Sequence, residues 1–137
     1  MATINVEIVS AEREIFSGEA DMVVAAAEAG DVGVAAGHAA FISRLRAGEI
    51  RVLHNDGEED SIFVTGGILE VQPTQVTVLA DTAERNDDID EAQAEDARRR
   101  AEEMMQGGGD IDLAAAQRDL VQATARLHYI KKLRSKR

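Results

Sequence analysis

The sequence predicts a β-plus-α fold in which an antiparallel β sandwich, or flattened barrel, precedes an antiparallel hairpin of two helices. The prediction depends on a change of composition near residue 86, strand-like segments before it, and two apolar seams of helical spacing after it. Residues 1–85 hold eight of the eleven glycines, the only proline and all three phenylalanines. Residues 86–137 are rich in Ala, Arg and acids, which favour helices. We therefore predict a β domain over residues 1–85 and a helical domain over residues 86–137.

In the first domain, apolar segments of strand length alternate with turn residues. Ile4, Val6 and Ile8 recur at the period of two that a half-buried strand requires. Further strands are predicted at residues 22–27, 41–45, 50–53, 62–65, 68–71 and 76–79. Glycine, Asn or Asp separates them at residues 17–18, 30–33, 37, 47–48, 55–57 and 66–67. This short repeat of strand and turn is typical of an antiparallel sandwich.

The second domain opens with a helix start signal. Asp88, followed by an acid three positions later, resembles a capping box, so we predict a first helix over about residues 88–106. The glycines at residues 107–109 end it, because glycine accepts the left-handed backbone conformation that follows many helices. Asp110 is then suited to cap a second helix, predicted over about residues 110–133.

Both helices carry an apolar seam whose gaps alternate between three and four residues. In the first helix the seam is Ala94, Ala97, Ala101 and Met104, and in the second it is Leu113, Ala116, Leu120, Ala123, Leu127 and Ile130. Alanine buries little apolar area, so the pair of helices gains less from packing than a leucine-rich pair would. We therefore predict a hairpin that is marginal by itself and able to detach or change shape.

The composition excludes several classes of function. A net charge of -11 argues against nucleic acid as the main partner, since phosphate binding needs clustered positive charge. The chain has no cysteine, its serines lack a Gly-x-Ser-x-Gly frame, and its three histidines lack metal-ligand spacing, so we expect neither a catalytic nor a metal site. No apolar segment approaches the roughly 20 residues that span a bilayer, and the start lacks a signal or transit pattern. We expect a soluble non-enzyme without direct membrane insertion, at most a peripheral partner of a membrane.

The chain ends in a basic segment, because residues 120–137 hold six cations and no acid. Cations at a helix C-terminus interact favourably with the helix dipole, which explains some of them. Six cations are more than the helix dipole requires, so we predict that this basic segment docks on an acidic protein surface. Anionic lipid is the alternative partner, although the narrow seam has no Trp or Phe to insert. The second hypothesis is therefore an independent binding module that binds lipid or an unrelated acidic protein.

Several motifs, in order along nearly the whole chain, resemble one family. They are VSAE at residues 9–12, FSG at 16–18, GDVGV at 30–34, GHA at 37–39, GGILEV at 66–71 and VTVLAD at 76–81. Together they are similar to the epsilon subunit of bacterial F-type ATP synthase. The resemblance implies about ten strands in a β sandwich followed by two antiparallel helices.

By that resemblance, the chain would be a non-catalytic subunit of the central rotating stalk, peripheral at the cytoplasmic face of the bacterial plasma membrane. The β domain would lie beside the gamma subunit and on the c-ring, and help couple proton-driven rotation to ATP synthesis in the alpha and beta subunits. Asp31 and His38 match the family's rotor contact. Ala36 and Ala40 stand where the family usually has proline, which implies a looser loop around His38.

The resemblance also implies that the helices lie folded on the β domain or extend along gamma. When extended, the second helix would meet an acidic segment of the catalytic beta subunits and restrain ATP hydrolysis. The positions that match this role are Arg126, Lys131, Lys132 and Arg134.

Some family members bind a regulatory nucleotide on the folded hairpin. Asp90, Arg100 and Arg126 match positions of that site, whereas Gln93 and Gln122 stand where it has arginines. The resemblance therefore implies at most weak ATP binding and no required cofactor.

Overall fold

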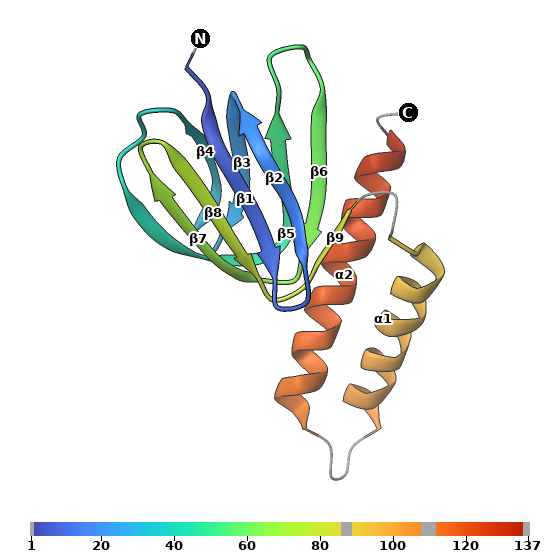
Figure 1. Cartoon of the computed structure of the whole chain (residues 1–137). Coiled ribbons are helices and arrows are strands. Elements are labelled where there is room, and N and C mark those ends of the chain that lie inside the picture. The colour runs from blue at the N-terminus through green and yellow to red at the C-terminus, as the bar shows by residue number, and fades with distance from the viewer. Residues whose placement is uncertain (1, 86–88, 108–111, 136–137) are drawn as a thin grey trace. The chain divides into compact units, whose positions relative to one another are not determined.

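The computed structural model describes residues 2–85, 89–107 and 112–135. The chain divides into two compact units, Met1–Asn86 and Asp87–Arg137, which are described separately below. The first is built of strands and the second of two helices (Figure 1). This confirms the predicted fold class, a β sandwich followed by a helical hairpin.

Nine strands form the described part of the β unit. They are β1 (Ile4–Ser10), β2 (Glu14–Ala20), β3 (Met22–Ala27), β4 (Gly30–Ala35), β5 (Phe41–Leu53), β6 (Glu59–Val64), β7 (Gly67–Gln72), β8 (Gln75–Ala80) and β9 (Ala83–Arg85). The main path of the sheet runs β2-β1-β8-β7-β5-β3-β4, with β6 paired to β5 and β9 paired to β6. All strand pairs are antiparallel except β1 with β8, which is parallel.

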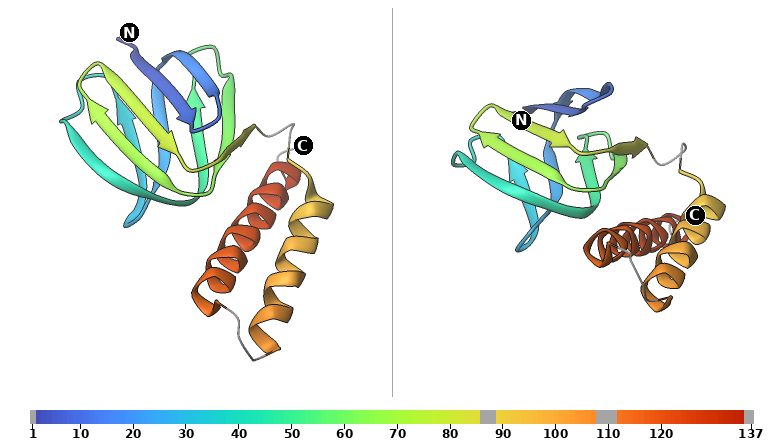
Figure 2. Two further views of the ribbon diagram at one scale, coloured as in Figure 1. Left: turned by 60° about the horizontal axis from the view of Figure 1, so that its bottom comes forward. Right: turned by 90° about the horizontal axis from the view of Figure 1, so that it is seen from below.

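The long strand β5 explains why the structure has nine strands where about ten were expected. Its residues Phe41–Leu45 pair with β7, and its residues from Gly48 onward pair with β6, so one strand serves two parts of the sheet. The turn predicted at residues 47–48 is therefore wrong. A Cβ at Gly48 would lie 2.9 Å from the Cβ of Ala26, so the glycine there permits close packing against β3 rather than a turn. Figure 2 shows β5 following the curve of the sheet.

Three other strands differ from the sequence prediction. Residues 30–33, predicted as a turn, open strand β4, and residues 17–18 lie inside β2. The three-residue strand β9 was not predicted. Its last residue, Arg85, is held in place by a hydrogen bond from its guanidinium to the carbonyl oxygen of Ile15 (3.0 Å) and an ion pair with Asp60 (3.4 Å).

One apolar core lies within the β unit. The alternation predicted for the first strand is confirmed, because Ile4, Val6 and Ile8 are all buried there. Neighbouring strands contribute alternate residues, among them Ile50, Ile62, Leu69, Val71, Val76 and Val78. On β1, β7 and β8 the side chains between them point outward and form part of the surface of the unit.

The second unit consists of helices α1 (Glu91–Gln106) and α2 (Leu113–Ser135), which pack antiparallel (Figure 1). The start predicted at Asp88 is wrong for α1, although Asp88 itself lies outside the described residues. The actual N-cap is Asp90, whose Oδ1 accepts hydrogen bonds from the backbone N–H groups of Ala92 (2.9 Å) and Gln93 (3.2 Å). Gly107, just after the helix, keeps a right-handed φ of -71°.

The second helix begins and ends later than predicted. Asp112 stands before it and accepts a hydrogen bond from the backbone N–H of Ala115 (3.1 Å), while the predicted cap Asp110 lies outside the described residues. The helix continues two residues past Leu133, to Ser135. No helix in the described part of the chain is both long and apolar enough to cross a membrane.

The predicted thin seam is confirmed between α1 and α2. Its buried alanines are Ala94, Ala101, Ala116 and Ala123. Larger apolar residues gather near the start of α1, where Leu127 and Ile130 of α2 pack on Ala94 and the partly buried Ile89. At the other end of the hairpin, Met104 and Leu113 are about half exposed, so these two predicted seam residues are not buried between the helices.

Candidate functional site

Asp31 lies near the start of the edge strand β4, with its side chain exposed. Its Oδ1 accepts a hydrogen bond from Nη2 of Arg46 (2.6 Å) on β5. The same guanidinium donates to the carbonyl oxygen of Ala27, so one arginine ties the carboxylate to the neighbouring backbone. The carboxylate is therefore held at a fixed place on the surface while 64% of its side chain stays accessible.

His38 lies in the loop after β4. The backbone N–H of Gly37 bonds to the carbonyl oxygen of Pro73 (2.8 Å), which fixes this loop to the turn between β7 and β8. The Nδ1 atom of His38 lies 2.9 Å from the carbonyl oxygen of Ala39, and its ring lies beside Phe41 with 5.3 Å between ring centroids. The imidazole is thus a positioned loop side chain. From Asp31 to Ala35 the strand rises about 13 Å, so the structure does not join Asp31 and His38 in one cluster.

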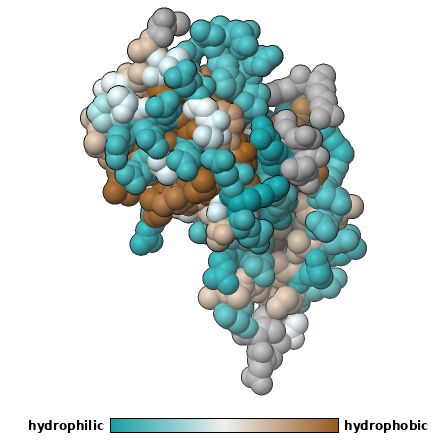
Figure 3. All heavy atoms as spheres, viewed as in Figure 1, coloured by the Kyte–Doolittle hydropathy of each residue, from teal (hydrophilic) through white to brown (hydrophobic). Residues whose placement is uncertain are grey.

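An exposed apolar row crosses the outer face of the sheet and was not singled out by sequence reasoning. Leu79 of β8 pairs with Ile68 of β7 on one side and with Val9 of β1 on the other. Leu79 is 46% exposed and Ile68 37%, and Ile42 on β5 is 72% exposed nearby. Figure 3 shows hydrophobic side chains gathered along one margin of the β unit among hydrophilic neighbours. The signal available in the sequence was an apolar residue at the outward position of each of these strands.

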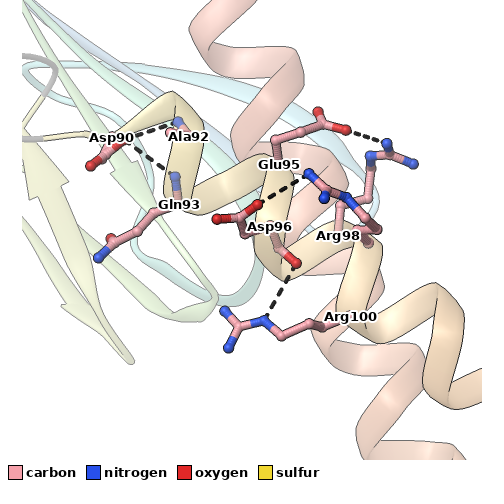
Figure 4. A network of polar contacts seen from close by, with 8 residues as sticks. Asp90, Ala92, Gln93, Glu95, Asp96, Arg98 and Arg100 are labelled. Carbon is pink, nitrogen blue, oxygen red and sulfur yellow. Dashed lines mark hydrogen bonds and ion pairs between the residues drawn. The ribbon is translucent and has the colours of Figure 1, made fainter.

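On α1, acids one turn away hold the first two of three consecutive arginines. The Arg98 guanidinium pairs with Glu95 (Figure 4) and with Glu102, and Arg99 pairs with Asp96. The hydrogen bond from Arg98 holds the pKa of the Glu95 carboxyl below its ordinary value, and the same contact raises the pKa of Arg98. Both arginines are therefore occupied within their own helix.

Arg100 differs from its two neighbours because it borders a groove between the helices. Its Nε donates to the backbone carbonyl oxygen of Asp96 (3.4 Å). Arg100 and Arg126 both line a groove of about 330 Å³, together with Asp119, Gln122, Met104 and alanines of the seam. Two guanidinium groups beside one groove can bind an anionic ligand such as a phosphate.

Asp90 does not belong to that groove. It caps the start of α1, and Arg100 follows ten positions later, which corresponds to about 15 Å along the axis. The structure therefore brings together two of the three residues predicted for nucleotide binding and leaves the third as a helix cap.

The four cations predicted for the inhibitory contact also divide into two places. Arg126 is partly buried beside the groove, whereas Lys131, Lys132 and Arg134 are exposed in the last turns of α2. The Arg134 guanidinium pairs with the Glu91 carboxylate of α1. The further cations at residues 136 and 137 lie outside the described residues. Within the described ranges, no group of three or more acids and histidines is placed to hold a metal ion.

Two family models match the chain, one on each unit. The β-sandwich domain of the ATP synthase delta/epsilon chain matches residues 3–86, and the long α-helix domain of the same chain matches residues 87–131.

Curated relatives are similar over nearly their whole length. A protein of Thioalkalivibrio sulfidiphilus named ATP synthase epsilon chain is 56% identical over 134 residues, which cover 96% of this chain and 95% of the relative. A protein of the same name from Nitrosococcus oceani is 53% identical over 135 residues, covering 98% of this chain and 96% of the relative.

Solved structures share the fold at lower identity. A chain of the Euglena gracilis mitochondrial ATP synthase, in an OSCP/F1/c-ring structure, has a TM-score of 0.75 at 20% identity and covers 99% of this chain and 82% of its own. A chain from the central stalk and c-ring of the Tetrahymena thermophila enzyme has a TM-score of 0.59 at 13% identity, covering 95% of each chain.

Proposed function

This chain belongs to the ATP synthase delta/epsilon chain family, and we propose that it serves as a non-catalytic subunit of the central stalk of a rotary ATP synthase. In this role it couples proton-driven rotation to ATP synthesis and restrains ATP hydrolysis. Its partners are the gamma subunit, the c-ring and the catalytic alpha and beta subunits. It is peripheral to the membrane as part of that complex, at the cytoplasmic face of the bacterial plasma membrane. The observation that carries this proposal is the sequence identity of more than half, over nearly the whole chain, to proteins named ATP synthase epsilon chain.

The β unit offers two different surfaces to the rotor. The apolar row of Ile42, Ile68 and Leu79 is suited to gamma, because exposed apolar side chains are a typical centre of a protein interface. Asp31 and the loop of His38 are suited to the polar loops of the c-ring, because their polar groups are held in position by backbone contacts. The two surfaces lie on separate elements, so one β unit can contact both partners at once.

The hairpin supplies the restraint on hydrolysis. Lys131, Lys132 and Arg134 are exposed, and the alanine seam that holds α2 to α1 buries little area. α2 can therefore leave α1 and place its cations against an acidic segment of the catalytic subunits. Arg126 joins this contact only after the groove between the helices opens, because it borders that groove in the folded hairpin.

The same groove supports weak nucleotide binding through Arg100 and Arg126. Two guanidinium groups can contact the phosphates of ATP, whereas Asp90 is already used as the N-cap. Binding there requires the closed hairpin, so bound ATP would favour the folded form. Isothermal titration of the full chain with ATP measures this, and equal heat from the chain with Arg100→Gln would contradict it.

Removal of the hairpin tests whether the β unit binds gamma while the hairpin restrains ATP hydrolysis. The cut belongs after Arg85, because this residue anchors β9 to Ile15 and Asp60. We expect residues 1–85 to fold and to bind gamma, since the apolar core lies wholly within them. The complex with the truncated chain should hydrolyse ATP faster than the complex with the full chain. Equal rates would contradict the inhibitory role, and loss of gamma binding would contradict the role of the β unit.

Charge reversal separates the cations from the rest of the hairpin. Replacing Lys131, Lys132 and Arg134 with Glu removes three exposed pairs worth about 0.5 kcal/mol each, so the concentration that half-inhibits hydrolysis should rise about tenfold. Inhibition by the unmodified chain should also fade with salt, because exposed charges are screened. Anionic liposomes without other subunits provide the control, since sedimentation with them would favour lipid as the partner of α2.

A further inference from the structure

Acids of α1 already engage the basic end of α2 within the folded hairpin. The carboxylate of Glu91 pairs with the guanidinium of Arg134, although 43 positions separate them in the sequence. Among the described residues, the ion pair of Glu91 is the one with Arg134, and its neighbours one turn along α1, Ala94 and Glu95, are not basic. Its charge is therefore directed across the hairpin to the other helix.

A second acid on the same face of α1 feels a cation of α2 without pairing with it. Glu95 lies one turn after Glu91, and Lys131 lies one turn before Arg134 on the antiparallel helix. The hydrogen bond from Arg98 is the main cause that lowers the pKa of Glu95, and the positive charge of Lys131 lowers it further. One acid of α1 is thus paired with a cation of α2, and a second acid lies within the electrostatic reach of another.

Apolar contacts fix the register of these charges. Leu127 and Ile130 of α2 pack on Ala94 and Ile89 at the same end of the hairpin. Glu91 and Arg134 lie at the same end of the hairpin as this packed cluster, so their approach follows from the helix seam and not only from flexible side chains. Opening the seam at this end would release Arg134 from Glu91.

We propose that Glu91 is an intramolecular competitor for Arg134, occupying in the folded hairpin the cation that would otherwise contact the catalytic subunits. This rests on the proposed function, which assigns that acidic contact to the end of α2, and it adds how the contact is restrained. Arg134 pairs either with Glu91 or with the acidic segment, and the charge at residue 91 biases the choice. Neutralising Glu91 therefore favours the extended, inhibitory form.

The size of the effect follows from exposure. The side chain of Arg134 is 65% exposed and that of Glu91 37%, so solvent screens the pair. Pairs of this kind shift an equilibrium by about two- to fivefold. The proposal thus predicts a graded change in inhibition by Glu91→Gln, not an all-or-none switch.

The test uses the full chain assembled with gamma and the catalytic head. Glu91→Gln should increase inhibition of ATP hydrolysis about two- to fivefold at low salt, and the increase should disappear near 1 M salt, where the Debye length is about 3 Å. Glu103→Gln is the matched control, because Glu103 is an exposed acid of α1 without an ion pair among the described residues. Equal inhibition by the chain with Glu91→Gln and the unmodified chain would overturn the inference.

A direct measurement of opening separates competition from helix stability. The chain lacks cysteine, so Gln93→Cys and His128→Cys, both at exposed positions, allow spin labels on the two helices. Glu91→Gln should raise the population with a long label distance, and Arg134→Gln should remove this difference. Glu91 also lies in the first turn of α1, where an acid favours the helix. A difference that persists with Arg134→Gln would assign the effect to that cause and overturn the inference.

The two levels of the proposal fail in different ways. Equal hydrolysis with the full chain and with the chain cut after Arg85 would overturn the inhibitory part of the proposed function and the competition together. Inhibition by the full chain that is insensitive to Glu91→Gln would overturn the competition alone.

Discussion

Gly67 is the glycine of the β unit whose replacement should be most disruptive. It opens β7 with a φ of +138°, a conformation that favours glycine. A Cβ there would lie 2.2 Å from the carbonyl oxygen of Leu79 and 2.9 Å from the Cα of Ala80. Both atoms belong to the backbone of the paired strand β8, so no side-chain rotation relieves the collision. Gly67→Ala must therefore move two strands apart as well as strain its own backbone.

Gly30 provides a matched control for the backbone strain. It opens β4 with a φ of +141°, and a Cβ there would meet no atom within 4 Å. Gly30→Ala should thus cost only the strain, about 1–3 kcal/mol. Gly67→Ala should cost the same plus the forced shift of packed strands, about 1–3 kcal/mol more. The difference between the two variants isolates the collision.

Scanning calorimetry of the full chain measures this difference. For a domain of this size, 2 kcal/mol corresponds to roughly 8–16 °C in the midpoint of thermal unfolding. We expect Gly67→Ala to melt below Gly30→Ala by about that amount, and both to melt below the unmodified chain. Midpoints that agree within about 2 °C would refute the argument from the close approach of β7 and β8.

Two further predictions concern the surface and the hairpin. Ile68→Glu should weaken binding to gamma by about tenfold or more, measured by gel filtration, because the side chain lies in the apolar row. The midpoint of unfolding, measured by calorimetry, should stay within a few degrees because the side chain is exposed. The hairpin should lose helicity as the pH falls below 4.5, because the Arg98 contact lowers the pKa of Glu95 from that ordinary value. A carboxyl with a lowered pKa stabilises the fold above its unfolded pKa and loses this contribution as the pH falls through the folded one. Circular dichroism should show a smaller acid-induced change with Glu95→Gln, and an unchanged titration would contradict the assignment.

The sequence predicted those elements whose periodicity is set by a single buried face. β1 is an example, because its inward residues are all aliphatic and its outward residues include Asn5 and Glu7. β4 was missed because its sequence, GDVGVA, contains two glycines and an acid, and its pairing with β3 decides its conformation. β5 was divided in two because Gly48 resembles a turn residue, and only the neighbouring Ala26 reveals why glycine is needed. Tertiary contacts override local propensity at these points.

The candidate sites also divide into those that the local sequence pattern predicts and those that only tertiary contacts create. That Arg100 and Arg126 share a groove follows from two antiparallel helices with alanine seams, and the sequence contained that information. The tie between Asp31 and Arg46 and the pair of Glu91 with Arg134 join positions far apart in the chain. Neither pairing leaves a local pattern, because each depends on the register of whole elements.

The weakness of the hairpin is a requirement of the proposed switch. A partner can shift a two-state equilibrium only by its difference in affinity for the two states. Exposed ion pairs with the end of α2 supply up to about 1 kcal/mol each. Each of the four buried alanines of the seam, if it were leucine, would add about 2 kcal/mol to the folded hairpin, or about 8 kcal/mol in all. Three or four such ion pairs could not open that seam, whereas the alanine seam leaves the two forms close enough in free energy for one carboxylate, Glu91, to affect the outcome.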